Sequence, residues 1–212
     1  MEQTYAIELK NITKRFGKIV ANDGINLKVK RGEILSLLGE NGSGKTTLMN
    51  MISGIYFPDE GRILVDGKAV SIRSPKDSFD LGIGMIHQHF KLIDVMTAAE
   101  NIILGLKGNA VLDMKKVHKD IQELVDRYGF DLDPAQKVYT MSVSQKQTVE
   151  IVKMLYRGAN ILILDEPTAV LTPQEVDKLF EVLRNMRDDG RAIIIITHKL
   201  NEVLELSDRV AI

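Results

Sequence analysis

The stretch GENGSGKT, from Gly39 to Thr46, contains residue types that can hold a phosphate group. It follows the apolar run ILSLL and opens the helix-forming segment KTTLMNMIS, the strand–loop–helix context that a phosphate-binding loop requires. The glycines let successive backbone N–H groups point inward at a β-phosphate, Lys45 reaches the β and γ oxygens, and Thr46 offers its hydroxyl to Mg²⁺. We therefore predict a nucleotide site formed by Gly39, Glu40, Asn41, Gly42, Ser43, Gly44, Lys45, Thr46 and Thr47.

Two carboxylates end a second apolar run, ILILDEP, which spans residues 161–167. Ligands of open α/β sheets sit beyond the carboxyl ends of the strands. Asp165 is placed there to hold Mg²⁺ through water, and Glu166 to orient and deprotonate an attacking water. Alone, such a pair is more often a solvated turn. Together with the phosphate loop it predicts a site for phosphoryl transfer.

Gln88 and His198 also follow apolar runs, IGMIH and AIIIIT respectively. A lone histidine after a strand is usually structural. Here it follows the next core strand after the paired carboxylates, so we expect Gln88 and His198 to converge on one γ-phosphate.

The segment YTMSVSQKQTVEI begins like a phosphate-facing helix in which glycines have been replaced. Ser142 lies three residues before Gln145, and Ser144 three residues before Gln147, so both pairs fit a capping box. The free N–H groups of the helix start should therefore survive.

Composition sets the class of protein. The chain has 212 residues, enough for one good-sized domain, with 28 basic and 29 acidic side chains and no cysteine. A net charge of −1 gives no reason to expect general affinity for nucleic acid or anionic lipid. The apolar runs are far shorter than the roughly 20 residues of a membrane helix, and the N-terminus does not have the pattern of a signal peptide. We expect the isolated chain to be soluble.

The pattern of apolar runs predicts an α/β fold with a mostly parallel sheet covered by helices. The runs EILSLL, ILIL and AIIII are apolar throughout and should form the buried core strands. Shorter, polar-flanked runs predict an N-terminal antiparallel annex. The expected strands are 6–9, 25–29, 34–38, 62–65, 83–87, 161–164, 192–197 and 209–212.

Two helices are marked by their ends. One should begin after the cap Asp113 and end before Gly129, and the other should begin at Pro173 after the cap Thr172, with Glu175 completing a capping box. Between about residues 91 and 157 the pattern is helical without a core-strand run, which predicts an inserted helical subdomain.

In this order and spacing, the phosphate loop, Gln88, MSVSQ, ILILDEP and His198 resemble the nucleotide-binding domain of ABC transporters, a P-loop NTPase fold, over essentially the whole chain. The phrases MIHQHFKL, TAAENIILG, YRGANILILDEPTAVLTPQEV and ITHKLNEV look most like the first cassette of importers for nucleosides and simple sugars. The resemblance implies an ATPase that uses ATP and Mg²⁺ and is coupled to a separate membrane permease. It places the protein peripherally at the cytoplasmic face of the membrane, with a solute-binding protein as an indirect partner and no nucleic-acid partner.

The resemblance also implies roles for single residues. Phe16 stands where the family stacks an aromatic ring on adenine, and Gln88 would sense the γ-phosphate and Mg²⁺. In the family, two cassettes face each other head to tail, and a signature in one completes the ATP site of the other. Here Ser142, Val143, Ser144 and Gln145 stand in the signature. If position 144 needs a positive φ, serine costs on the order of 1–2 kcal/mol, and we expect a weakened signature.

Other interpretations remain open at this point. A soluble ABC protein acting on ribosomes or DNA usually carries basic inserts or coiled-coil arms, which this sequence lacks, and a regulatory cassette without turnover disagrees with the intact Glu166 and His198. The chain reads as a single cassette over residues 1–212. Since SDRVAI stops inside a predicted strand, we expect it to be the first cassette of a longer two-cassette protein. The sequence does not name the solute.

Overall fold

The computed structural model describes residues 5–88, 90–106 and 113–212. At its centre lies a five-stranded sheet in the order β6-β7-β8-β3-β9, in which every neighbouring pair is parallel. Its strands are β3 (Glu33–Leu38), β6 (Ile83–Ile86), β7 (Ile161–Asp165), β8 (Ala192–Thr197) and β9 (Arg209–Ala211). The predicted parallel core is confirmed.

The central strands are buried on both faces of the sheet. On β7, Ile161 and Ile163 pack into one hydrophobic cluster, whereas Leu162 and Leu164 pack into another on the opposite side of the sheet. Neighbouring side chains of a strand point to opposite faces. A strand that is apolar at every position is therefore buried on both faces, as expected for a parallel sheet.

A second, antiparallel sheet has the order β2-β1-β4-β5 and confirms the predicted annex. Its strands are β1 (Ile7–Phe16), β2 (Ile19–Val29), β4 (Glu60–Val65) and β5 (Lys68–Val70). The first two are longer than the predicted ranges 6–9 and 25–29, and β5 was not predicted. The β1–β2 pairing continues through several register shifts, each of which interrupts the apolar alternation on which the prediction rested.

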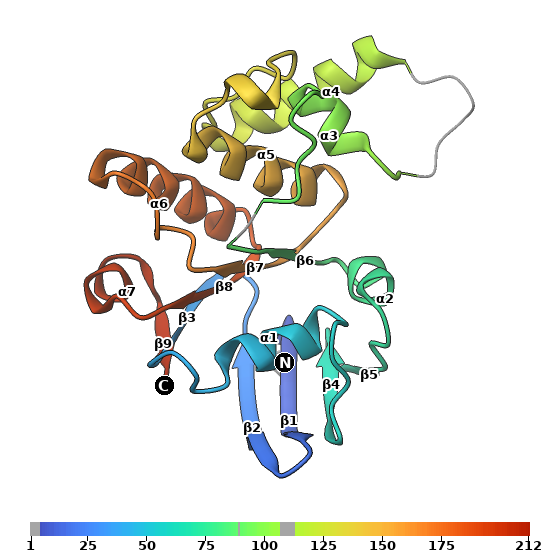
Figure 1. The fold of residues 1–212 in the computed structure, drawn as a ribbon, viewed down its shortest axis with the longest axis vertical. Helices are drawn as coiled ribbons and strands as arrows, with labels where there is room; N and C mark the ends of the chain where they lie inside the picture. Colours follow the sequence, from blue (N-terminus) through green and yellow to red (C-terminus); the bar gives the residue numbers. More distant parts are fainter. Residues whose placement is uncertain (1–4, 89, 107–112) are drawn as a thin grey trace.

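Helices fill the space between and above the sheets (Figure 1). Helix α1 (Lys45–Ile52) packs with the antiparallel sheet against one face of the parallel sheet, and α6 (Pro173–Asp188) covers the other face. The remaining helices are α2 (Pro75–Asp80), α3 (Ala98–Ile103), α4 (Met114–Tyr128), α5 (Val143–Tyr156) and α7 (Leu200–Leu206), with a 3₁₀ turn at Val138–Thr140. Among the described residues, no helix combines the length and apolarity needed to cross a bilayer.

The inserted helical segment lies between β6 and β7, where α3, α4 and α5 pack around a core of their own. Helix α5 joins this core to the rest of the molecule. Its Val149 and Val152 face the helical core, while Ile151 and Leu155 face the parallel sheet.

The predicted helix ends are confirmed. The side chain of Asp113 accepts hydrogen bonds from the N–H groups of Lys115 and Lys116, and Gly129 ends α4 with φ of 77°. Thr172 and Glu175 form the reciprocal capping box of α6, with Pro173 in its first turn. These local contacts satisfy backbone groups that helix ends leave free.

Candidate nucleotide site

The loop between β3 and α1 has the conformation that its glycines predict. Gly42 and Gly44 adopt φ of 86° and 91°, in the left-handed region that favours glycine. A Cβ atom on Gly44 would lie 2.4 Å from the carbonyl oxygen of Ala21, because β2 packs directly against the loop. Glycine is therefore required at position 44 for both its backbone conformation and its size.

Lys45 is the first residue of α1, and its ammonium group lies within the curve of the loop. Its Nζ donates to the carbonyl oxygens of Gly39 and Glu40, each at 2.7 Å, and to Oγ of Ser43 at 3.1 Å. Thr46 follows in the first helical turn with an exposed side chain, and Thr47 is half-buried. A cation and a helix start therefore share one concave loop, which suits a polyphosphate.

Asn22 on β2 contacts this loop, and the sequence pattern did not predict this contact. Its side chain is 6% exposed, and Nδ2 donates to the carbonyl oxygen of Gly44 at 3.3 Å. Its Oδ1 is buried without a partner. No local pattern singles out Asn22, because its role depends on β2 lying against a loop that follows a different strand.

Glu166 occupies a strained turn immediately after β7. It has φ of 50°, which is unusual for a residue with a side chain, and its N–H donates to the carbonyl oxygen of Ile196 on β8 at 2.9 Å. A left-handed residue of this kind costs about 1–3 kcal/mol. The rest of the fold offsets this cost, and the result is a carboxylate held at the edge of the sheet.

His198 and Glu166 are brought into direct contact. Nδ1 of His198 lies 2.8 Å from Oε1 of Glu166, and the carboxylate side chain is only 14% exposed. The second oxygen, Oε2, is buried without a hydrogen-bond partner. One carboxylate oxygen is thus fixed by the imidazole, and the other can accept a hydrogen bond.

Gln88, Asp165 and Glu166 line one small cavity of about 30 Å³, together with His87, Phe90 and Gln147. A cavity needs about 10–15 Å³ to hold a water molecule, so this one has room for a water beside the catalytic candidates. Gln88 itself is exposed just beyond β6. The convergence of Gln88 and His198 on one γ-phosphate stays a prediction.

Burial raises the pKa of Asp165, the neighbouring charge of Glu166 raises it further, and the charge of Lys45 lowers it. Lys45 and Asp165 are therefore close enough to interact, although they lie on different elements. The hydroxyl of Thr46, the carboxylate of Asp165 and the amide oxygen of Gln88 are the oxygen ligands that Mg²⁺ prefers. Mg²⁺ usually takes only one or two carboxylates and completes its shell with water and substrate phosphates.

The donor set fits this pattern. Among the described residues, no group of three or more His, Cys, Asp or Glu side chains is placed to hold a metal ion.

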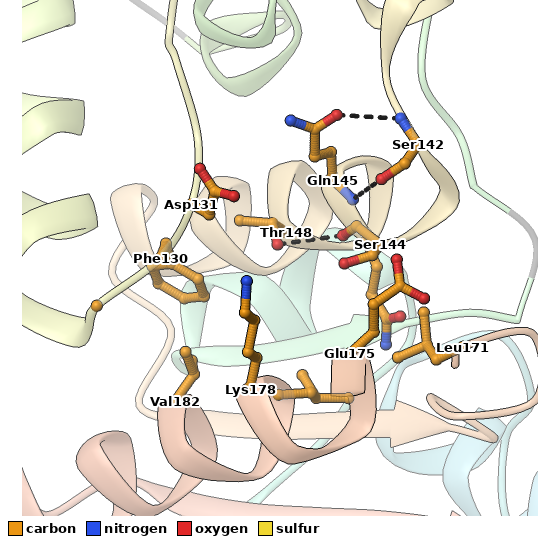
Figure 2. A pocket seen from close by; sticks show the side chains of 13 residues that line it. Phe130, Asp131, Ser142, Ser144, Gln145, Thr148, Leu171, Glu175, Lys178 and Val182 are labelled. Carbon is orange, nitrogen blue, oxygen red and sulfur yellow. Dashed lines mark hydrogen bonds between the residues drawn. The ribbon is translucent and has the colours of Figure 1, made fainter. Parts of the chain in front are cut away.

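The first turn of α5 is formed by the predicted signature residues. Ser142 is the N-cap, its Oγ accepts from the N–H of Gln145 at 3.2 Å, and Oε1 of Gln145 accepts from the N–H of Ser142 at 3.0 Å (Figure 2). This capping box is confirmed. The second predicted box, between Ser144 and Gln147, is wrong because Ser144 already lies inside the helix.

The expected strain at Ser144 is also wrong. Ser144 is the second residue of α5 and is not among the described residues with positive φ. In Figure 2, the side chains of Glu175 and Lys178 extend from α6 toward this turn. Hydrogen bonds from the backbone and side chain of Thr172 lower the pKa of Glu175, and a hydrogen bond from Ser144 contributes. Serine at this position therefore does not distort the backbone.

A cavity of about 280 Å³ separates the signature turn from α6, lined by side chains of α5, α6 and the segment after α4, among them Phe130, Asp131, Ser144, Thr148 and Lys178. It is distinct from the cavity that holds Glu166. Gln147 lines both cavities and is 5% exposed. Gln147 therefore contributes both to the cavity beside the first turn of α5 and to the cavity beside Glu166.

Phe16 ends β1 and is 42% exposed. Its ring meets that of Tyr56 edge to face, with centroids 5.2 Å apart, and Nζ of Lys14 lies 5.4 Å from its centroid. Tyr56 is a neighbour that the sequence analysis did not identify. The exposed ring is available for stacking, and its contact with adenine stays a prediction.

The structure thus gathers Gln88, Asp165, Glu166 and His198 at the carboxyl ends of β6, β7 and β8. The phosphate loop follows β3, the next strand in the sheet. Ser142, Val143, Ser144 and Gln145 lie apart from this group, at the start of α5.

Comparison with known proteins identifies the relatives of this arrangement. Residues 22–169 match a family model described as ABC transporter. The chain is 50% identical over 214 residues to "Nucleoside import ATP-binding protein NupA" of Lactococcus lactis subsp. cremoris, covering 100% of this chain and 42% of the relative. It is 53% identical over 210 residues to "Guanosine import ATP-binding protein NupO" of Bacillus subtilis, covering 98% of this chain and 41% of the relative.

A solved structure shows the same fold. The ADP conformation of MJ1267, an ATP-binding cassette of an ABC transporter, superposes with a TM-score of 0.86 at 26% identity, covering 97% of this chain and 86% of that one. The chain spans about two fifths of the length of the curated relatives.

Proposed function

The chain belongs to the ABC transporter family, and we propose that it binds ATP with Mg²⁺ and hydrolyses it as the motor domain of an importer. The observation that carries the proposal is the pairing of His198 with one oxygen of Glu166, while the other oxygen stays free beside a cavity that can hold one water. A phosphate loop on the neighbouring strand supplies the site for the reacting nucleotide.

The residues divide the work of hydrolysis. Lys45 and the N–H groups of residues 42–47 bind the β- and γ-phosphates, and Phe16 stacks on adenine. Thr46, Asp165 and Gln88 would hold Mg²⁺, whose charge stabilises the negative charge on the phosphates. Oε2 of Glu166 accepts the proton of the attacking water. The water oxygen bonds to the γ-phosphorus as the bond to the β-phosphate oxygen breaks, which releases ADP and phosphate.

A second cassette completes the ATP sites in this proposal. The first turn of α5 presents free backbone N–H groups and the exposed side chain of Val143. A helix start of this kind favours a phosphate, and Ser142 to Gln145 would face the nucleotide held by the partner cassette. Because Ser144 is unstrained in the helix, we expect this signature to be competent.

The transported solute is a nucleoside or a simple sugar. The names of the relatives favour a nucleoside, and guanosine is named for one of them. Membrane permease subunits would carry the solute across, a solute-binding protein would deliver it, and the cassette would lie at the cytoplasmic face of the membrane. The association of this chain with permease subunits, and indirectly with a solute-binding protein, is part of the proposal.

The test co-expresses the full-length protein with a nucleoside permease. Glu166→Gln should keep ATP binding and abolish both the hydrolysis contributed by this cassette and nucleoside uptake, because it removes the base and leaves Asp165 in place. Glu123→Gln, on the exposed face of α4, should change neither. Hydrolysis by Glu166→Gln at the wild-type rate would contradict the assignment of the base. Purification with ribosomes instead of a permease would contradict the transport role.

A further inference from the structure

A network of polar side-chain contacts joins Thr168, Lys199 and Glu202, which lie close in sequence to Glu166 and His198. Thr168 is 1% exposed, and its Oγ1 donates toward Glu202, whose Oε1 and Oε2 lie 2.7 and 2.6 Å away. Nζ of Lys199 donates to the carbonyl oxygen and Oγ1 of Thr168 at 3.1 and 3.2 Å, and lies 2.9 Å from Oε1 of Glu202. The three side chains form a closed triangle of contacts.

This triangle joins the two catalytic loops. Thr168 lies two residues after Glu166, and Lys199 is the residue after His198. The pairing of β7 with β8 extends only to Asp165 and Ile196, so both catalytic side chains stand beyond the strands. The N–H of Glu166 still donates to the carbonyl oxygen of Ile196, and side-chain contacts hold the loops together further along the chain.

The network is built from strong interactions in a shielded place. The side chain of Glu202 is 15% exposed and that of Lys199 is 37% exposed. Hydrogen bonds to ionised groups are shorter and stronger than neutral ones, and a low local dielectric strengthens them. Removing the Thr168 hydroxyl would leave a half-buried carboxylate with Lys199 as its remaining partner.

We propose that Thr168, Lys199 and Glu202 are positioning residues that hold the Glu166 loop and the His198 loop together for attack on the γ-phosphate. This inference rests on the proposed function. None of the three needs to touch the nucleotide. They act by fixing the distance between the imidazole and the carboxylate, and hence the direction in which Oε2 of Glu166 faces the attacking water.

Thr168→Val tests the hydroxyl, because valine keeps the shape and loses the donor. In the complete polypeptide, kcat should fall about ten- to a hundredfold, the range expected when a catalytic group is displaced by up to about 1 Å. The KM for ATP and the affinity for ATP should stay within about threefold, because the phosphate loop is untouched. Thr168→Ser should restore most of kcat, since serine retains the donor.

Glu202→Gln and the double variant test the partnership. If the residues act as one unit, the loss of kcat in the double variant Thr168→Val/Glu202→Gln should not exceed the larger of the two single-variant losses. If Thr168→Val fails to fold, the single variants Glu202→Gln and Lys199→Met and their double variant provide the same test. Thr13→Val is the matched control. Thr13 is 3% exposed and its hydroxyl accepts from the N–H of Gly24 at 3.0 Å in the antiparallel sheet, so it should lower stability without changing kcat.

Three outcomes would overturn the inference: Thr168→Val with the wild-type kcat, Thr168→Ser as impaired as Thr168→Val, or independent losses that multiply in the double variant. Glu166→Gln in the same assay separates this failure from that of the proposed function. If Glu166→Gln abolishes hydrolysis while Thr168→Val leaves it unchanged, the base is correctly assigned and the network alone is refuted.

Discussion

Nδ1 of His198 lies 2.8 Å from Oε1 of Glu166, and Oε2 of the same carboxylate is buried without a partner. The two oxygens of one side chain therefore have different surroundings. The imidazole fixes the orientation of the carboxylate, and Glu166 lines a cavity that can hold water. In the proposed mechanism, His198 therefore positions the base, in addition to the γ-phosphate contact that the sequence predicts.

His198→Ala should lower kcat about a hundredfold or more, the typical contribution of a positioned proton-transfer group, while the affinity for ATP changes only a few-fold. Steady-state hydrolysis and equilibrium ATP binding in the complete polypeptide would measure both. His118→Ala on α4 is a control away from the site. A loss of ATP affinity as large as the loss of kcat would show that His198 mainly binds the γ-phosphate.

Lys45→Ala should weaken ATP binding by about tenfold to 150-fold, since one hydrogen bond to a charged group contributes about 1.5–3 kcal/mol. Titration calorimetry in the Glu166→Gln background would measure the affinity without turnover. Lys115→Ala, exposed at the start of α4, should bind ATP normally. An unchanged affinity for Lys45→Ala would refute the phosphate-loop assignment.

Local pattern was enough to predict the parts of the site that depend on neighbours in sequence. The phosphate loop, the carboxylates after β7 and the caps of α4, α5 and α6 are each set within a few residues. The fully apolar strands also predicted a parallel sheet, because only burial on both faces explains them.

Contacts between distant segments could not be predicted in the same way. The triangle of Thr168, Lys199 and Glu202 forms only when β7 and β8 pair, and Asn22 reaches Gly44 only when β2 packs on the loop. Ser144 shows the opposite error. The expected cost applied only if position 144 needed a positive φ, and the capping box at Ser142 places this residue in the helix.

Ser144→Gly should therefore not accelerate hydrolysis at the composite site. Glycine should lower stability by about 0.5–1 kcal/mol relative to alanine at the same position, through its low helix propensity. Urea denaturation and hydrolysis in an assembled two-cassette protein would test both effects. Ser144→Ala, which keeps the helix propensity, separates them. A higher rate with glycine than with alanine would show that close backbone approach limits the reaction.

Tyr128 joins the helical segment to the residues at the end of α6 through polar contacts. The hydroxyl of Tyr128 donates to Oδ2 of Asp189 at 2.5 Å and accepts from Nε of Arg191 at 2.9 Å. The bond from Tyr128 lowers the pKa of Asp189, and a hydrogen bond from Arg127 lowers it further. Tyr128→Phe should lower the free energy of unfolding at pH 7 by about 1–2 kcal/mol, since a buried hydrogen bond to a charged group is lost.

The pH dependence follows from the sign of the shift. A carboxyl group whose pKa is depressed in the folded state stabilises the fold above its unfolded pKa of about 3.9 and loses that contribution as the pH falls through the folded value. The stability of the wild type should therefore fall more steeply below pH 4 than that of Asp189→Asn. Urea denaturation across this range would measure both, with Asp23→Asn, exposed on β2, as the control. Equal slopes for the wild type and Asp189→Asn would show that the Tyr128 bond does not favour the ionised carboxylate.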